Sequence, residues 1–275
     1  MNCSLIISVY KNTRFLRAVL HSLYYQTVQD FEVIISEDGE STEMKEFLSR
    51  WPFNTPWQHL TQPDEGWRKN RALNRAICAA RANHLIFIDG DCVLHPRFIE
   101  MHERHFHPNA ILAGKRALLN QKLSERIISN PSSIKTLQSF MLMALLWHRG
   151  TKRAEEGIFI SPDGLLSFIP KSRKLNYLTG CNMSFSREAI EHINGFDEDY
   201  VAPAYGEDTD LVWRFQMAGY HFISLRNLAV QYHLWHPLSW TDQNENMALG
   251  NSKRMRGEYR CLNGLSQYRL TSSAT

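Results

Sequence analysis

Three short apolar segments, each followed by a helical pattern, constrain the fold of this chain more than any other feature. The apolar segments cover residues 4–9, 31–35 and 84–88. Apolar side chains then recur at helical spacing in segments that begin near residues 13, 41 and 68. Strands that are hydrophobic almost throughout are buried on both faces, as in a parallel sheet covered by helices. The sequence therefore predicts an α/β fold.

Polar residues follow each of these strands at the point where it ends. They are Tyr10-Lys11-Asn12, Glu37-Asp38-Gly39 and Asp89-Gly90-Asp91. In parallel α/β sheets, ligands bind beyond the carboxyl ends of the strands. We therefore expect the three polar groups to meet in one cleft.

The pattern changes after the third strand and returns later in the chain. Residues 116–174 are basic and helical in the middle, which indicates an insertion over the cleft. Strand and helix signals return in residues 175–240, and residues 241–275 form a polar, partly helical tail. We therefore expect one domain in which the insertion separates a first half, residues 1–115, from a second half.

The composition restricts the class of protein and of partner. The chain has 275 residues, 43% of them hydrophobic, and a net charge of +3, which fits a sizeable core without a strong overall field. Its arginines gather on one helix without interleaved aromatic residues, which argues against a nucleic-acid partner. The five cysteines are scattered and form no CxxC pair. We therefore predict neither a disulfide framework nor a zinc site, and a reducing, cytoplasmic location.

The hydropathy pattern predicts neither a secretory nor a membrane-spanning segment. The N-terminus begins almost at once as a strand, and not as a signal peptide. The densest apolar run, residues 140–147, is far shorter than a membrane span. We therefore expect a soluble protein, for which peripheral contact with the inner membrane stays open.

Asp89 and Asp91 are the first candidates for a metal site. Two carboxylates that flank Gly90 at a strand end can aim at one cation, and Mg²⁺ or Mn²⁺ favours such oxygen ligands. Asp and Gly are also common turn formers, so a bend that ends the strand explains the same residues. The residues alone leave both interpretations open.

Acidic residues also open a later helix. Residues 206–210 read Gly-Glu-Asp-Thr-Asp and precede an apolar helical pattern. Asp208 or Asp210 is either an N-cap at the positive end of the helix dipole or a general base that takes the proton of an attacking hydroxyl. His233 and His236, which follow a strand, are either metal ligands or members of an aromatic surface loop.

Basic residues crowd the helix that precedes the third strand. Arg68 and Arg71 lie near its start, where they would reach a phosphate. For Arg75 and Arg81 we favour a solvated basic face. Their positions alone do not separate a ligand contact from a surface charge.

Two further pairs of residues have both a binding and a turn interpretation. Glu37 and Asp38 would accept hydrogen bonds from a base or ribose, or form a turn. Gly180 opens a strand beside Asn182, where a glycine lets a ligand approach closely or merely bends the chain.

Taken in order along the chain, these segments resemble the family-two inverting glycosyltransferases with a GT-A fold. The matching blocks are residues 6–10 (Ile-Ile-Ser-Val-Tyr), 34–39 (Ile-Ile-Ser-Glu-Asp-Gly), 87–91 (Phe-Ile-Asp-Gly-Asp, the DxD motif), 179–185, 195–198 and 206–208. The last three also resemble the carboxyl end of β-galactosyltransferases. The resemblance covers about residues 3–115 and 175–237. It implies a Rossmann-like mixed sheet flanked by helices, with the nucleotide-sugar in the first half and the acceptor in the second.

The resemblance implies a role for each matching residue. Contacts to the nucleotide fall to Val9, Tyr10, Asp38, Arg68, Arg71, Asp89 and Gly90. Ligands of a Mn²⁺ or Mg²⁺ ion are Asp91, Asp89 and His233, with His236 as the alternate. The general base is Asp208, with Glu207 beside it on the acceptor. Contacts to the donor or acceptor sugar fall to Gly180, Asn182 and Tyr205.

Two residues depart from the family pattern. Glu37 replaces the usual first Asp of the second block, which affects the expected contacts to the base. Tyr205 stands where a Trp often precedes Gly-Glu-Asp, which affects stacking of the acceptor. Both changes fall in the expected cleft.

The resemblance implies that a sugar is transferred from a nucleotide-sugar to a hydroxyl of a glycan or glycolipid, in an inverting and metal-dependent reaction. A UDP-sugar is the first choice of donor. By analogy, the process is bacterial surface polysaccharide synthesis. One alternative is a nucleotidyltransferase, but residues 10–14 lack the glycine-rich loop that such enzymes carry after the first strand. The other is a non-catalytic carbohydrate-binding protein that retains the fold, against which the complete set of acidic residues argues.

Overall fold

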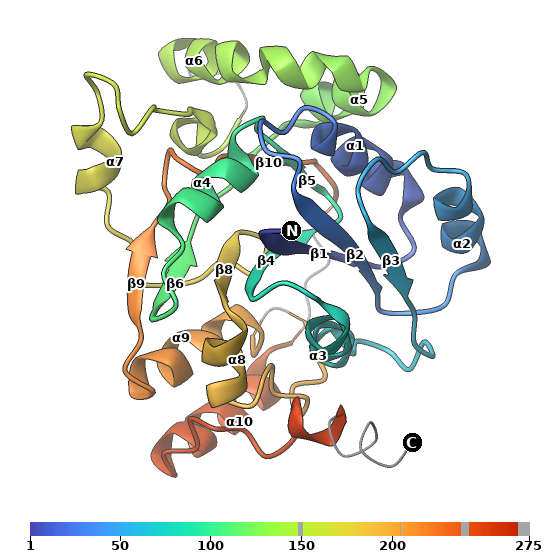
Figure 1. The fold of residues 1–275 in the computed structure, drawn as a ribbon, viewed down its shortest axis with the longest axis vertical. Coiled ribbons are helices and arrows are strands. Elements are labelled where there is room, and N and C mark those ends of the chain that lie inside the picture. The colour runs from blue at the N-terminus through green and yellow to red at the C-terminus, as the bar shows by residue number, and fades with distance from the viewer. Residues whose placement is uncertain (148–150, 204, 238–241, 269–275) are drawn as a thin grey trace.

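The computed structural model describes residues 1–147, 151–203, 205–237 and 242–268. Helices cover both faces of a central sheet, and a helical layer lies across one end of the molecule (Figure 1). Among the described residues, no helix is long and apolar enough to cross a membrane.

Seven strands form the central sheet. Their order is β3 (Trp57–Leu60), β2 (Phe31–Glu37), β1 (Cys3–Val9), β4 (His84–Asp89), β8 (Met183–Ser186), β6 (Ala110–Ala113) and β9 (His221–Ser224). β8 runs antiparallel to its neighbours β4 and β6, and the other neighbouring strands pair in parallel. The predicted α/β fold with a mixed sheet is therefore confirmed.

The register brings the ends of three strands to one edge of the sheet. Val9 of β1 pairs with Glu37 of β2, and Ser8 pairs with Asp89 of β4. Because these strands are parallel, the polar residues that follow them leave the sheet at the same edge.

Two hydrophobic cores lie on opposite faces of the sheet, and β1 contributes to both. Leu5 and Ile7 belong to the core covered by α1 (Thr13–Leu23), α2 (Thr42–Ser49) and α4 (Phe98–His105). Ile6 belongs to the core covered by α3 (Lys69–Ala79), α8 (Arg187–His192) and α9 (Asp208–Met217). Successive side chains of a strand point to opposite faces. The apolar run therefore shows no polar alternation because both faces of β1 are buried.

A second, small sheet lies beside the first. It consists of β5 (Cys92–Leu94), β10 (Gln231–His233) and β7 (Ala117–Leu118). β10 pairs antiparallel with β5, so that His233 lies opposite Cys92. The sequence does not predict this sheet, because strands of two or three residues show no period. This small sheet nevertheless places His233 of β10 beside β5, the strand that follows Asp91.

The segment expected as an insertion contains α5 (Gln121–Ser129), η1 (Pro131–Thr136), α6 (Leu137–Trp147), η2 (Ala154–Gly157) and α7 (Phe168–Ser172). α5 and η1 contact α1, and α6 packs on η2. In the tail, α10 (Asn244–Met255) lies at the end of the molecule opposite α6 (Figure 1).

The third helix is shorter than its sequence pattern. The helical segment expected to begin near residue 68 forms a helix from Lys69 to Ala79. Arg81, which follows this helix, is exposed as expected, and it also donates a hydrogen bond of 2.8 Å to the carboxylate of Glu32, which is fully buried. A buried carboxylate needs a charged partner, and Arg81 supplies it from the edge of the fold.

Arg214 is a fully buried arginine on α9. Its guanidinium donates to the carboxylate of Asp210 at 2.9 Å and to backbone carbonyls that include those of Gly195 and Tyr259. One side chain thus joins α9 to the turn after α8 and to the tail.

Replacing Arg214 with alanine should lower the free energy of unfolding by about 3–5 kcal/mol, because Asp210 and the carbonyls would stay buried without their donor. The matched control is Arg254→Ala, an exposed arginine of α10, which should cost less than about 1 kcal/mol. Chemical denaturation measures both. Equal losses in the two variants would contradict this role for Arg214.

Candidate active site

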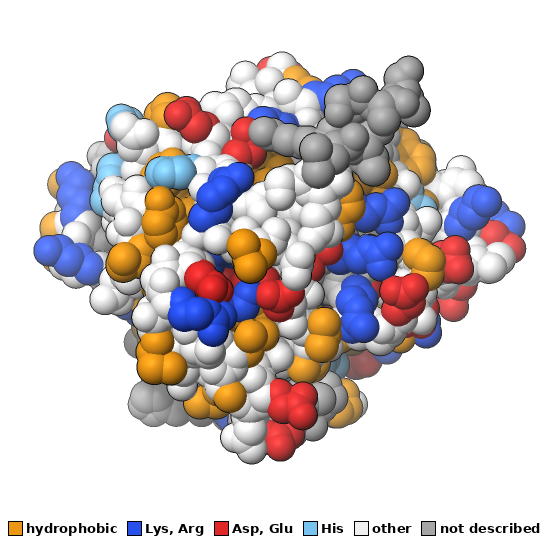
Figure 2. Space-filling model, turned by 90° about the horizontal axis from the view of Figure 1, so that it is seen from below, with side chains coloured by type: hydrophobic (Ala, Val, Ile, Leu, Met, Phe, Trp, Pro, Cys, Tyr) orange, Lys and Arg blue, Asp and Glu red, His pale blue; other side chains and the backbone are white. Residues whose placement is uncertain are grey.

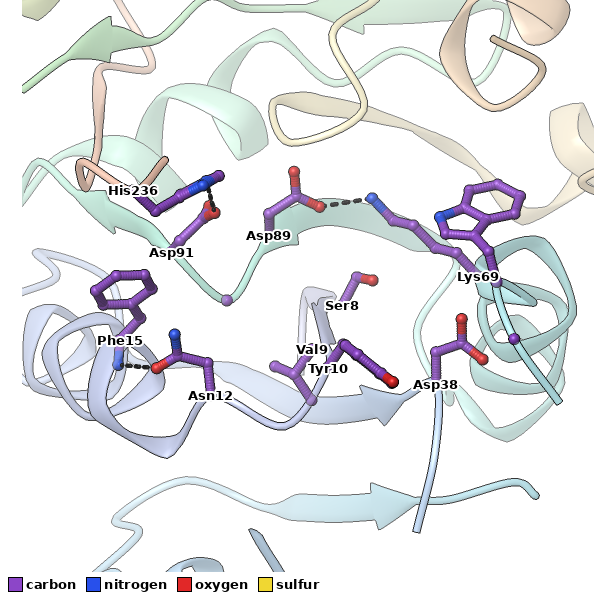
Figure 3. Close-up of a pocket in the computed structure, with 13 residues that line it drawn as sticks. Ser8, Val9, Tyr10, Asn12, Phe15, Asp38, Lys69, Asp89, Asp91 and His236 are labelled. Atoms are coloured by element: carbon purple, nitrogen blue, oxygen red, sulfur yellow. Dashed lines mark hydrogen bonds and ion pairs between the residues drawn. The ribbon is translucent and has the colours of Figure 1, made fainter. Parts of the chain in front are cut away.

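A hollow of about 580 Å³ opens where β1, β2 and β4 end. Figure 3 shows Val9 and Tyr10 at the end of β1, Asp38 after β2, and Asp89 and Asp91 around this hollow. The three strand ends that the sequence indicates are therefore brought together.

Gly90 lets the turn after β4 pass close to β1. Its N–H donates to the carbonyl of Ser8 at 2.8 Å. A Cβ atom at this position would lie 2.7 Å from the side chain of Val9, closer than real Cβ contacts allow. The turn therefore requires glycine so that Asp89 and Asp91 can flank the end of β1.

Asp38 is held at one end of the hollow by two donors. Its Oδ1 accepts a hydrogen bond from the side-chain amide of Gln62, and its Oδ2 accepts one from the backbone N–H of Arg68, both at 2.8 Å. The rings of Tyr10 and Trp67 also line the hollow. A carboxylate between aromatic rings suits a nucleobase. Trp67 is missing from the predicted set, although an aromatic residue just before a helix start was a usable signal.

Asp91, His233 and His236 form a compact group of possible metal ligands. Asp91 Oδ2 lies 3.3 Å from Nε2 of each histidine, and the ligand atoms of all three residues lie within 4.8 Å of one another. Asp91 comes from the turn between β4 and β5, His233 from β10 and His236 from the loop after it. One carboxylate and two imidazoles fit Mn²⁺, which accepts both oxygen and nitrogen ligands.

The protonation of this group follows from its contacts. Burial on its own would raise the pKa of Asp91, but hydrogen bonds from His233 and His236 and the charge of Arg116 hold it well below its usual value. The contact with Asp91 in turn raises the pKa of His236. The carboxylate is therefore ionised at any physiological pH, as a metal ligand must be.

Asp89 has different partners from Asp91. Lys69, the first residue of α3, places its Nζ 2.7 Å from Asp89 Oδ1 and 2.9 Å from Glu207 Oε1. Arg116 lies 3.8 Å from the other oxygen of Asp89. Neither Lys69 nor Arg116 is in the predicted set, and nothing in their local sequence distinguishes them from the other basic residues.

Glu207 and Asp208 form an acidic pair at the start of α9. Asp208 Oδ2 accepts a hydrogen bond of 3.0 Å from the N–H of Gly180. Burial raises the pKa of Asp208. Burial also raises the pKa of Glu207, to about 7. The negative charges of Asp89 and Asp208 raise this pKa further, whereas the positive charge of Lys69 lowers it. Both carboxyls therefore accept a proton more readily than an ordinary carboxyl does, and Glu207 does so near neutral pH.

Gly180 packs closely against this acidic pair. A Cβ atom there would lie 2.2 Å from Oε1 of Glu207. The close approach that this glycine allows is made here by Glu207, and the predicted sugar contact of Gly180 stays a prediction. Its neighbour Asn182 is fully buried, with its side chain hydrogen-bonded to His102 and to the carbonyls of Lys115 and Ala229. Asn182 orders the loop and does not face the cleft, so its predicted sugar contact is corrected.

Three further predicted residues lie away from the main hollow. The side chains of Arg68 and Arg71 line a second hollow of about 430 Å³, together with Tyr268 and other residues. Arg71 is paired with Glu65 at 3.1 Å. Tyr205 packs against Gly250 of α10. Arg68 reaches the main hollow through its backbone: its N–H donates to Asp38, and its carbonyl accepts from Gln62, which also donates to Asp38.

Comparison with protein families gives two matches. Residues 4–193 match the model described as "Glycosyl transferase family 2". Residues 167–237 match the model described as "N-terminal domain of galactosyltransferase". The first match covers β1 to α8, and the second covers the acidic pair and both histidines.

Curated relatives are longer than this chain. It is 22% identical to a chondroitin synthase of Escherichia coli over 240 residues, which is 84% of this chain and 34% of the relative. It is 20% identical to a hyaluronan synthase of Pasteurella multocida, over 84% of this chain and 24% of the relative. The chain thus spans about a third of the first relative and about a quarter of the second.

Solved structures share the fold. The TM-score is 0.61 to residues 1–349 of Staphylococcus aureus TarS in complex with UDP-GlcNAc, at 15% identity over 92% of this chain and 66% of that chain. It is 0.59 to the mannosyltransferase PcManGT of Pyrobaculum calidifontis in complex with GDP-Man and Mn²⁺, at 15% identity over 94% and 67%. These neighbours are GT-A glycosyltransferases, so the GT-A fold is confirmed.

The raised pKa of Glu207 predicts a specific pH dependence of stability. Between the ordinary value of 4.5 and the folded value of about 7, the folded chain holds a proton on Glu207 that the unfolded chain releases. The free energy of unfolding should therefore fall as the pH rises through this window. Glu207→Gln cannot ionise, so it should gain about 1–3 kcal/mol relative to the parent across the window.

Urea denaturation at several pH values measures this difference. The control is Glu40→Gln, an exposed glutamate, whose curve should run parallel to that of the parent. A parallel curve for Glu207→Gln as well would show that Glu207 has an ordinary pKa.

Proposed function

Because this chain belongs to glycosyl transferase family 2, we propose that it transfers a sugar from a nucleotide-sugar to a hydroxyl of a glycan or glycolipid, with inversion at the anomeric carbon. That it is a glycosyltransferase follows from the family and from the relatives. The donor class, the metal and the stereochemistry are the proposal. Relatives named for chondroitin and hyaluronan synthesis support a polysaccharide acceptor.

The observation that carries the proposal is the position of Lys69. It lines the main hollow, and its ammonium lies between Asp89 of the DxD motif and Glu207 of the acidic pair. The candidate nucleotide end and the candidate acceptor end are therefore parts of one site. This arrangement suits a reaction in which a group passes from a diphosphate to a hydroxyl.

We assign the donor to the half formed by residues 1–115. Asp38, Tyr10 and Trp67 would bind the base, and Asp89 lies toward the ribose and diphosphate. The structural neighbours solved with UDP-GlcNAc and with GDP-Man support a nucleotide-sugar, with UDP as the first choice. The half formed by residues 175–240, with Asp208, would take the acceptor.

Asp91, His233 and His236 would hold the metal ion. Two imidazole nitrogens favour Mn²⁺ over Mg²⁺, which prefers oxygen ligands only. When bound, such an ion neutralises negative charge on the departing nucleoside diphosphate. Lys69 and Arg116 add two protein cations around Asp89 on the same side of the site.

Asp208 is the proposed general base. Burial raises its pKa above that of an ordinary aspartate, which strengthens it as a base, and the N–H of Gly180 holds one of its oxygens in place. It takes the proton of the acceptor hydroxyl while that oxygen attacks the anomeric carbon. The attack comes from the side opposite the diphosphate, so the configuration inverts. Glu207 orients the acceptor beside it.

Asp208→Asn should lower kcat by about 10²–10⁴-fold, because the amide keeps the shape but cannot take the proton. UDP affinity should stay within about twofold, since the donor half is unchanged. Asp30→Asn, an exposed aspartate far from the hollow, is the matched control and should keep its kcat. Turnover of a UDP-sugar panel measures the effect. Normal kcat in Asp208→Asn would exclude Asp208 as the base.

Asp91→Ala should remove the dependence of UDP binding on Mn²⁺, because it deletes the only carboxylate among the three ligands. In the parent, calorimetry should show UDP affinity rising by about tenfold or more when Mn²⁺ is present. The variant should show equal affinity in both conditions. An equal affinity with and without Mn²⁺ in the parent itself would reject the metal role.

A further inference from the structure

Residues 134–174 expose an unusual number of large apolar side chains. Among the described residues of this segment, the exposed ones are Leu142, Met143 and Leu145 on α6, and Leu165, Leu166 and Phe168 at the start of α7. Leu165 is 99% exposed. Single exposed apolar residues are normal, but clusters of them mark surfaces that bind a membrane or another molecule.

The two apolar sites belong to one end of the molecule. α6 packs on η2. In the first turn of α6, the side-chain amide of Gln138 donates a hydrogen bond to the carbonyl of Phe159, which lies in the loop between η2 and α7. Figure 1 shows α6 and α7 toward the same end of the long axis, away from α10. In Figure 2, which looks at the molecule from the α10 side, apolar side chains are interspersed with charges of both signs.

The same segment carries the positive charge of the chain. Residues 134–174 contain seven lysines and arginines and three acidic residues, a net charge of +4 against +3 for all 275 residues. Two of the acids are neutralised: Asp163 pairs with Arg104, and Glu156 pairs with Arg173 and Arg226. The exposed cations that remain include Lys152, Arg153, Lys171 and Lys174.

We propose that this surface, α6 together with residues 164–174, docks on an anionic lipid bilayer. The exposed leucines and Phe168 would enter the interface between headgroups and acyl chains, while the lysines beside them meet the lipid phosphates. Apolar side chains next to a net positive charge match a negatively charged membrane surface. A protein partner that covered only the apolar residues would leave this charge unexplained. The proposal goes beyond sugar transfer, and its test needs no turnover.

Flotation of the full chain with vesicles tests the proposal. The chain should float with phosphatidylcholine vesicles that contain phosphatidylglycerol and remain at the bottom with phosphatidylcholine alone. Added salt should weaken the binding, because it screens the lysines. A chain that floats with neither kind of vesicle would overturn the proposal.

Paired substitutions test the two contributions separately. Leu165→Ser with Leu166→Ser should reduce partition to the anionic vesicles by about tenfold or more, since both side chains are exposed and contribute little to folding. The matched control is Met255→Ser with Leu262→Ser, two exposed apolar residues outside the segment, which should bind as the parent does. Lys171→Gln with Lys174→Gln should reduce partition by about fivefold for each lysine.

Two outcomes would count against the proposal even if vesicles bind. Equal losses in the leucine pair and its control would show that binding does not use this surface. A concentration-dependent dimer that the leucine pair abolishes, seen by light scattering, would show that a second copy of the chain covers the surface instead. Loss of partition in the leucine and lysine pairs alone, from a chain that stays monomeric, supports the bilayer.

Discussion

The ion pairs of Lys69 are the constraint on which the rest of the cleft depends. Its ammonium is largely buried and lies within 3 Å of two carboxylates, Asp89 after β4 and Glu207 before α9. Without this cation, the two partly buried carboxylates on either side of it would repel each other. Lys69 therefore does more than neutralise charge. It joins segments that lie 118 positions apart in the chain (207 − 89) and so sets how the two halves of the site face each other.

Two glycines make this approach sterically possible. At Gly90 a side chain would collide with Val9, and at Gly180 it would collide with the carboxylate of Glu207. The first glycine brings the DxD turn onto the end of β1. The second brings the loop before β8 onto the acidic pair, where its N–H also holds Asp208. At both positions, the backbone packs so closely against a neighbouring side chain that only glycine fits.

The features that follow from local sequence pattern could be predicted, whereas those that depend on contacts between distant segments could not. β1, β2 and β4 are predominantly apolar runs, so their existence and the meeting of their ends follow from the local pattern and the parallel-sheet rule. Lys69 and Arg71 look alike in sequence. They are two positions apart on α3 and so point to opposite sides of the helix, one toward the cleft and one toward the second hollow. Only the tertiary fold decides which of the two is functional. The small sheet that positions His233 is invisible for a different reason, since its strands are too short to show a period.

The carboxylates of the cleft owe their different pKa values to their partners more than to their burial. The side chains of Asp91 and Glu207 are 22% and 14% exposed, which is a small difference. Asp91 faces two imidazoles and the charge of Arg116, and its pKa is held low. Burial raises the pKa of Glu207 to about 7, because the single ammonium of Lys69, which Glu207 shares with Asp89, offsets the effect of burial only in part. The cationic partners thus keep Asp91 ionised, whereas burial beside one shared cation lets Glu207 take up a proton. In the proposed transfer, charge develops on the diphosphate and a proton leaves the acceptor, so each end of the cleft has the protonation behaviour that its half of the reaction needs.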